Sequence, residues 1–215
     1  MKKWFIGGGI AAILVVVAII VGTKLYASQA SSDIAAPTLS TNPAGSTDAS
    51  ISGDWTAGSG SYAGYRVAEV LNGEDVTVVG RTEQVTGTAT VTNDELTAAT
   101  VEVDLASVKT DSDRRDGYFV NKAIDVATYP KAAFTVTKPQ KLTESGTQKI
   151  SGELTIKGKT VPVVAELDIA RTDAGLETAG KVDVTWQDFG VEPPNMGFGS
   201  VVGAGSIEFF RKFTK

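Results

Sequence analysis

The stretch VPVVAELDI, residues Val161–Ile169, decides the fold. Apolar residues occupy every second position of it: Val161, Val163, Ala165, Leu167 and Ile169. Between them stand Pro162, Val164, Glu166 and Asp168. A period of two places alternate side chains on opposite faces of a strand, so this pattern predicts a strand with one face buried and the other in water.

The same alternation occurs on both sides of this stretch. Val101, Val103 and Leu105 alternate with Glu102 and Asp104, and Val182, Val184 and Trp186 alternate with Asp183 and Thr185. Further runs with strand composition lie near residues 62–70, 74–80, 82–91, 132–138, 148–157 and 200–211. Turn signals separate the runs at Asn93-Asp94, Ser145-Gly146, Lys157-Gly158-Lys159 and Asp173-Ala174-Gly175.

About eight strands joined mainly by short turns predict an antiparallel meander. No helices are available to cover a second sheet face, and closure into a barrel removes the exposed strand edges. We therefore expect an all-β fold, an antiparallel β-barrel of about eight strands, as a single domain at residues 54–215.

One segment, residues 108–130, departs from the strand pattern. Thr110 or Asp111 could cap a short helix that contains Arg114, Arg115 and Asp116, with Tyr118, Phe119 and Ile124 turned inward. A loop of this length in a compact barrel usually has a task, and we expect it to cover one end.

The barrel interior is open to two interpretations. An eight-stranded barrel is just wide enough to be filled by side chains or to hold one small ligand. The chain has 23 glycines, and Gly64, Gly87, Gly152, Gly180, Gly203 and Gly205 fall in or beside strands. These glycines either leave part of the interior empty or mark bulges and tight corners in a filled barrel.

The amino-terminal region predicts a membrane anchor and a linker. Two lysines precede an uncharged run, Trp4–Val21, which is about 27 Å long as a helix and just long enough to span a bilayer. The positive-inside rule then places the domain on the extracytoplasmic side of the cell membrane. We assign residues 1–26 to a single-pass transmembrane helix; the alternative is a signal peptide cleaved near Ser28-Gln29-Ala30 and a secreted protein. Residues 27–53, rich in Ser, Thr, Ala and Pro, are expected to form a flexible linker.

Composition excludes many chemistries. The chain has no cysteine and no histidine, so thiol nucleophiles, Ser-His relays and imidazole-bound or cysteine-bound metals are absent. Its net charge is −5, which disfavours nucleic acid as a partner. Asp111-Ser112-Asp113 lacks the downstream glycine and glutamate of a calcium loop. We expect no catalytic residues, metal or cofactor.

Candidate ligand contacts come from the predicted inward faces and from the long loop. Arg114, Arg115 and Asp116 could clamp a polar head group, because a guanidinium fork suits phosphate or carbonyl oxygens, or could simply anchor the loop. The aromatic residues Tyr65, Trp186 and Phe189 serve as core and as ligand contacts at once in a hollow barrel. The full set of candidates is Tyr65, Val101, Val103, Phe119, Phe134, Val136, Leu154, Ile156, Val163, Ala165, Val182, Val184, Trp186, Phe189, Arg81 and Arg115.

Six short motifs, in this order and spacing, resemble the YceI-like family over essentially all of residues 54–215. They are Gly64-Tyr65-Arg66-Val67, Gly80-Arg81-Thr82 with Val85-Thr86-Gly87, Thr110 to Asp116, Tyr129-Pro130 running to Phe134, Gly152 to Thr160, and Trp186-Gln187-Asp188-Phe189-Gly190. The resemblance implies a lipocalin-like antiparallel barrel that encloses a polyisoprenoid chain, often as a homodimer, without established catalytic residues. The retained anchor departs from the commonest members, which carry a secretory signal.

The leading hypothesis is therefore a binding module that holds an isoprenoid lipid, such as a quinone or a polyprenyl phosphate, at the outer face of the cytoplasmic membrane. Two alternatives remain. An enzyme acting on the bound lipid would need convergent Asp, Glu, Lys or Tyr side chains at the cavity. A structural surface domain would have a filled barrel.

Overall fold

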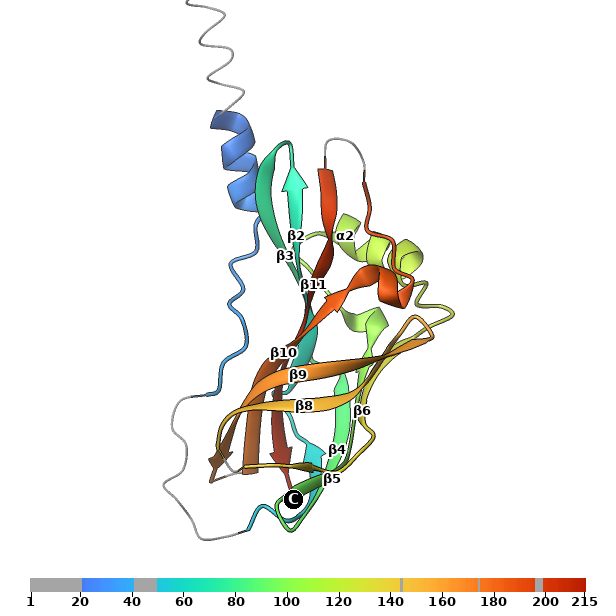
Figure 1. Cartoon of the computed structure of the whole chain (residues 1–215). Helices are drawn as coiled ribbons and strands as arrows, with labels where there is room; N and C mark the ends of the chain where they lie inside the picture. The colour runs from blue at the N-terminus through green and yellow to red at the C-terminus, as the bar shows by residue number, and fades with distance from the viewer. Residues whose placement is uncertain (1–20, 41–49, 144, 174, 196–198) are drawn as a thin grey trace, which may run out of the picture.

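The barrel is closed by pairing between its first and last strands. The computed structural model describes residues 21–40, 50–143, 145–173, 175–195 and 199–215. Antiparallel pairing runs in the order β1-β4-β5-β6-β8-β9-β10-β11, and β11 pairs back with β1, so eight strands form a ring (Figure 1). The prediction of an all-β antiparallel barrel of about eight strands is confirmed.

The strands of the ring have uneven lengths. They are β1 (Gly53–Ala57), β4 (Val85–Thr92), β5 (Glu95–Asp104), β6 (Lys131–Val136), β8 (Ser145–Ile156), β9 (Lys159–Thr172), β10 (Gly175–Thr185) and β11 (Gly199–Thr214). Residues Val161–Ile169 lie in β9, paired with β8 on one side and β10 on the other.

A further hairpin extends the wall at one end. β2 (Tyr62–Leu71) follows β1 along the edge of β11, and β3 (Glu74–Thr82) pairs with β2. β3 ends the strand order, and an isolated bridge joins Arg81 to Lys109. The short strand β7 (Gln140–Lys141) pairs with β5.

Two of the predicted turns are tight hairpin turns. Asn93 and Asp94 join β4 to β5, and Lys157 and Gly158 join β8 to β9, all four with positive φ. Two successive residues with positive φ match the twist of the flanking strands. The turn predicted at Ser145-Gly146 is wrong: β8 begins at Ser145, and Gly146 pairs with Ile169 despite its φ of 95°.

The long segment at residues 108–130 is helical, as predicted, in two short pieces. These are α2 (Asp113–Tyr118) and the π-helix η2 (Phe119–Ala123). The capping prediction is wrong, because the N-cap of α2 is Ser112. Thr110 instead donates from its N–H and its hydroxyl to Asp116, each at 2.8 Å, which ties the start of the segment to the helix. Two 3-10 turns, η1 (Leu105–Ser107) and η3 (Trp186–Phe189), complete the helical parts.

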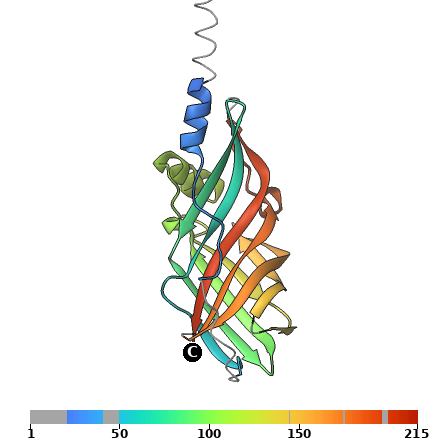
Figure 2. The ribbon, with the colours of Figure 1, turned by 90° about the vertical axis from the view of Figure 1, so that its left-hand side faces the viewer.

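The amino-terminal residues that the structure describes lie against the barrel. A helix at residues 21–30 stands beside the β2–β3 hairpin, and residues 31–40, here called the N-terminal strap, run down the outside of the barrel (Figures 1 and 2). The strap is hydrogen-bonded to β3 through Ser32 N to Thr77 O at 2.8 Å and Thr77 N to Ser31 Oγ at 3.0 Å. Arg66, Arg81 and Glu177 also bond to it. Part of the expected flexible linker thus has specific contacts.

The predicted anchor is for the most part outside the described residues. In the ranges that the structure covers, no helix combines the length and hydrophobicity that crossing a bilayer requires. Within the described helical residues 21–30, Leu25 and Tyr26 are 60% and 58% exposed.

Candidate functional site

The barrel encloses an elongated apolar cavity of about 760 Å³. One end lies near Trp55 and Phe213, where Ile51, Trp55 and Leu176 belong to a buried cluster, and Trp55 Nε1 donates to Ile51 O at 2.9 Å. The other end lies under α2, η2 and the helix at residues 21–30. A cavity of this size matches the range of about 300–1,000 Å³ in which small-molecule sites fall.

Strand alternation produces the apolar lining. On β9 the inward row is Ala165, Leu167 and Ile169, and their neighbours Glu166 and Asp168 are exposed. β5, β10 and β11 contribute rows in the same way. The row predicted from residues 161–169 therefore faces the cavity over its second half.

The strand glycines do not create the cavity by leaving space. A Cβ on Gly152 would lie 2.5 Å from the ring of Phe134, and one on Gly205 would lie 2.6 Å from the ring of Trp186. Both rings line the cavity, so these glycines let an aromatic side chain of the wall approach the strand backbone closely. Of the glycines considered from the sequence, Gly64 alone is on the lining, and a Cβ there would clash with Gly80 O at 1.9 Å.

Most of the predicted contact residues share this one cavity. Those on its wall are Tyr65, Val101, Val103, Phe119, Phe134, Val136, Leu154, Ile156, Ala165, Val182, Trp186 and Arg115. Their assignment as ligand contacts stays a prediction.

Three apolar candidates are in the core but not on the cavity wall. Val184 and Phe189 are buried, and Val163 is partly buried against the same cluster. The η3 turn contacts β9, β10 and β11, and its Phe189 is 1% exposed. The position of this turn depends on contacts with three strands, so the alternation of residues within a single strand does not predict it.

Arg81 lies on the outer face of the barrel and not in the cavity. Its guanidinium stacks over the ring of Tyr62 at 4.3 Å, donates to Ala35 O at 3.1 Å and lies 3.6 Å from Glu208. Glu208 also pairs with Arg66 at 2.5 Å. This outer cluster holds the N-terminal strap against the barrel.

An aromatic cluster occupies the helical end of the cavity. Tyr65 stacks on Phe119 with ring centroids 5.4 Å apart, and it meets Trp186 edge to face at 6.5 Å. Burial, and then the charge of Asp116, raises the pKa of Tyr65 to about 12. Tyr65 is therefore neutral over the physiological range and is unsuited to act as a base there.

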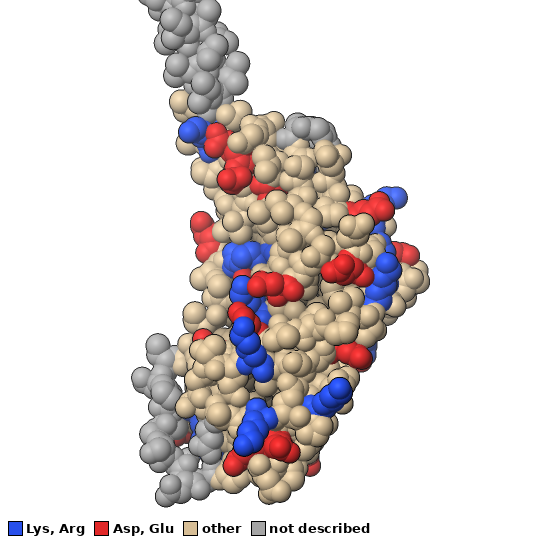
Figure 3. Space-filling view, in the orientation of Figure 1, with Lys and Arg blue, Asp and Glu red and all other residues tan. Residues whose placement is uncertain are grey.

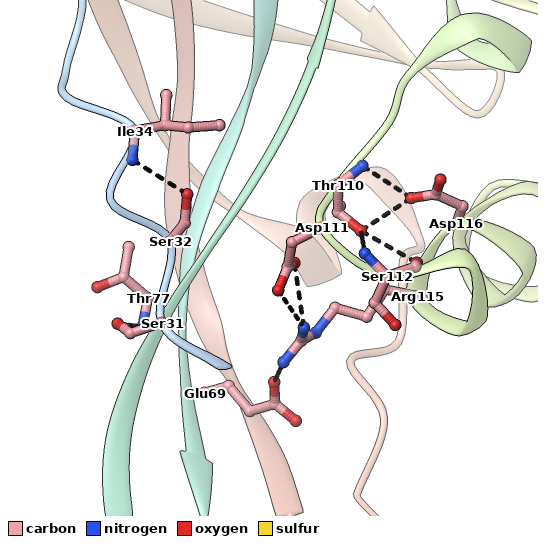
Figure 4. Close-up of polar contacts among 10 residues, drawn as sticks. All are labelled: Ser31, Ser32, Ile34, Glu69, Thr77, Thr110, Asp111, Ser112, Arg115 and Asp116. Atoms are coloured by element: carbon pink, nitrogen blue, oxygen red, sulfur yellow. Dashed lines mark hydrogen bonds and ion pairs between the residues drawn. The ribbon is translucent and has the colours of Figure 1, made fainter. Parts of the chain in front are cut away.

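Polar side chains surround this aromatic end and are paired with one another. Arg115 donates from Nη1 to both oxygens of Asp111 at 3.1 and 3.2 Å, and from Nη2 to Glu69 at 3.1 Å (Figure 4). Asp116, which is buried, accepts from Thr110 and lies 3.3 Å from Lys109 Nζ. Arg115 is thus held by two carboxylates, which fits a loop anchor better than a free head-group clamp.

Much of the cavity wall lies outside the set of residues predicted from the sequence, and two parts of it are chemically distinct. Tyr26, Gln29 and Ala30 line it from the amino-terminal helix, and Arg211 lines it from β11. The inward row of β11 is Ile207, Phe209, Arg211 and Phe213. A charged residue within this otherwise apolar row of the sequence indicates that a charge faces the interior. Nothing in the composition of residues 21–30 indicated that they fold back onto the barrel.

The described residues offer no metal centre, since no three Asp or Glu side chains gather among them. The face of the molecule in Figure 3 carries basic and acidic side chains beside each other, without a large patch of one sign.

The fold and the cavity together define a class: a closed antiparallel barrel with an apolar lumen. Sequence comparison is more specific. The model of the YceI-like domain matches residues 57–209, and the chain belongs to this family.

The solved structures with a similar fold include the following two. A polyisoprenoid-binding domain from Saccharophagus degradans implicated in plant cell wall breakdown has a TM-score of 0.59 at 16% identity, covering 74% of this chain and 97% of that domain. BcnA from Burkholderia cenocepacia has a TM-score of 0.55 at 19% identity, covering 70% and 96%. Among curated proteins, none matches the chain.

Proposed function

We propose that this protein binds the chain of an isoprenoid lipid inside its barrel and holds it at the outer face of the cytoplasmic membrane. The observation that carries the proposal is the apolar cavity of about 760 Å³, enclosed by inward rows of valine, leucine, isoleucine and aromatic side chains. Membership of the YceI-like family supports it, as does the polyisoprenoid-binding description of the Saccharophagus degradans domain.

The driving force is the transfer of the lipid chain out of water. Each buried CH₂ contributes about 0.8 kcal/mol, so affinity rises with chain length until the cavity is full. Little specific contact is required, because the hydrophobic effect is not directional. The mechanism is thus sequestration or transport of the lipid rather than chemistry on it.

The alternatives explain the cavity less well. A structural domain with a filled barrel would have no such lumen. An enzyme would need several unpaired titratable groups that converge on one point of the cavity, and at the helical end Arg115, Asp111 and Glu69 are engaged with one another.

Tryptophan fluorescence tests the proposal with probes that the chain already has. Trp55 and Trp186 line opposite parts of the cavity. Titration of the full chain with isoprenoid alcohols of increasing length should change the emission of both, and Trp55→Phe and Trp186→Phe should each remove one component. The affinity should rise at least about tenfold per added isoprene unit until the cavity is full.

A linear alcohol with the same number of carbon atoms is the matched ligand control. Equal affinity for the linear and the branched chain would mean that the barrel is a general lipid site rather than an isoprenoid site. Emission that does not respond to any alcohol would contradict the proposal.

The location and the lipid class are further parts of the proposal. A retained anchor places the barrel beside a membrane that supplies quinones and polyprenyl phosphates. Amino-terminal sequencing of the protein from its native membrane tests this, because an intact residue 1–26 segment is expected. A mature terminus at Ser31 would instead establish a secreted form. A homodimer, which the family resemblance implies, stays a prediction that the mass of the protein in solution tests.

A further inference from the structure

Arg211 is a buried cation on the wall of the apolar cavity. It stands in the inward row of β11 between Phe209 and Phe213, and it is 3% exposed. Thr178, its partner in the β10–β11 register, also lines the cavity. These two residues form a polar position within a lining that is otherwise apolar at this level of the barrel.

The protein satisfies only part of this guanidinium. Nη1 donates to Tyr62 O at 2.7 Å and to Phe210 O at 3.3 Å, whereas Nε finds no acceptor among the described residues. Within the same part of the chain no carboxylate lies within ion-pair distance of Arg211. The nearby carboxylates Glu177 and Glu208 are bonded outside the lumen, to Lys212 and Ser40 and to Arg66.

A buried charge without a counter-ion is costly, and a guanidinium does not escape the cost by losing its proton. Burial lowers the pKa of Arg211 to about 10, so the side chain remains charged at neutral pH. Its two bonds to backbone carbonyls could be made by a neutral donor. The charge itself therefore calls for an anion, and the cavity is the side from which an anion can come.

A second observation points the same way. The buried side-chain donors without a partner in the described part of the chain are Arg211 Nε and Trp186 Nε1, and both residues line this cavity. The ring of Trp186 packs against Gly205, which precedes Arg211 by six residues, or about 20 Å along the strand. Arg211 thus gives the lumen a cationic position away from the helical end, at a distance from the aromatic cluster of Tyr65, Phe119 and Trp186.

We propose that Arg211 binds the acidic head group, a carboxylate or a phosphate, of a single-chain amphiphile that lies in the lumen with its apolar chain directed toward the aromatic cluster. This inference rests on the proposed lipid-binding function and narrows its ligand class to acidic lipids rather than neutral quinones. Two adjacent N–H groups of a guanidinium form a fork that matches a carboxylate or phosphate, and such bonds are about twice as strong as neutral ones.

The test compares three ligands with one C20 chain: geranylgeranoic acid, geranylgeranyl phosphate and geranylgeraniol. Their binding to the full chain is measured by tryptophan fluorescence for the wild type, Arg211→Met, Arg211→Lys and Lys212→Met. The last variant removes one positive charge from the next residue of β11, which lies on the outer face.

The wild type should bind the acid, the phosphate or both about 10- to 100-fold more tightly than the alcohol. Arg211→Met should remove this preference, so that the three ligands bind with about equal affinity, whereas Arg211→Lys and Lys212→Met should keep it. Preference for one anion over the other identifies the head group as carboxylate or phosphate.

Equal affinity of the wild type for all three ligands would overturn the inference while leaving lipid binding intact, and this comparison needs no variant to fold. A proportional loss of all three ligands in Arg211→Met would also overturn it and would make Arg211 a structural residue. Failure of the wild type to bind any of the three would refute the proposed function, and the inference with it.

Discussion

Replacing Arg115 with methionine should destabilise the helical end of the barrel without changing which head group the protein prefers. The substitution removes two hydrogen bonds to Asp111 and one to Glu69. It keeps most of the aliphatic volume of the side chain.

The size of the effect follows from the exposure of these groups. The Asp111 carboxylate is 42% exposed and stands four residues before Arg115, so this pair contributes about 0.3–0.5 kcal/mol. The side chains of Glu69 and Arg115 are 17% and 23% exposed, and their pair belongs toward the upper part of the range for surface pairs, about 1 kcal/mol. A total loss of about 1–2 kcal/mol corresponds to a fall in melting temperature of about 2–8 °C for a domain of this size.

The assay combines a melting curve with binding of polyprenyl phosphate and the matching uncharged alcohol. We expect the melting temperature to fall and the two affinities to change by the same factor. Lys122→Met, which removes an exposed charge from η2, is the matched control and should change neither. An unchanged melting temperature with a selective loss of phosphate binding would refute this reasoning and would make Arg115 the head-group clamp.

Three other substitutions test the cavity and its walls. Ala165→Trp places an indole in the lumen and should sharply reduce lipid uptake while the barrel still folds. Val164→Trp, on the exposed face of the same strand, should leave lipid uptake unchanged. A full lipid load in folded Ala165→Trp would show that the lining is wrongly assigned. Tyr65→Phe should reduce the loss of stability that the wild type shows between about pH 10 and pH 12. The folded pKa of Tyr65, about 12, lies above the unfolded value near 10, so Tyr65 contributes up to about 3 kcal/mol below pH 10, and this contribution disappears as the pH rises through 12. Denaturant unfolding at pH 8 and pH 11.5 measures the effect, and an equal loss of stability in the wild type and the variant would mean that burial of Tyr65 is unimportant. Gly205→Ala should destabilise the fold by about 1–3 kcal/mol and change the emission of Trp186, because the new Cβ would lie 2.6 Å from both Arg66 O and the indole. Gly203→Ala, with open space around it, is the control and should be neutral. Equal stability of the two variants would argue against close packing of the indole on Gly205.

The barrel was predictable because its signals are local. Alternation at residues 161–169 fixes which face of β9 is buried, and the Asn93-Asp94 and Lys157-Gly158 pairs fix two hairpins. Ser145-Gly146 carries the same kind of signal and failed as a turn, because a glycine with positive φ can also sit at the start of a paired strand.

The parts that were not predictable depend on contacts between distant segments. Phe189 lies off the cavity wall in the η3 turn, which contacts β9, β10 and β11. Arg81 lies on the outer face, beside Glu208 and the N-terminal strap. The strap itself is fastened by Arg66 and Glu177, which lie far from it in the sequence. No periodicity within residues 27–53 encodes these bonds.

The sequence around Arg211 contains information about the cavity that the predicted set of contacts does not include. The position of Arg211 in the row Ile207, Phe209, Arg211 and Phe213 already marked a charge on an inward face. Whether such a charge meets a carboxylate across the barrel depends on the strand register. In the structure Glu177, on the neighbouring strand β10, and Glu208, on β11 itself, are bonded to other residues.

The most direct test of the central claim is mass spectrometry of the lipid that accompanies the full-length protein when it is purified from its native cells. Organic extraction should release close to one isoprenoid lipid per barrel from the wild type and much less from Ala165→Trp, with Val164→Trp resembling the wild type. Wild-type barrels that carry no isoprenoid, or an equal load in the variant whose lumen is blocked, would contradict the account.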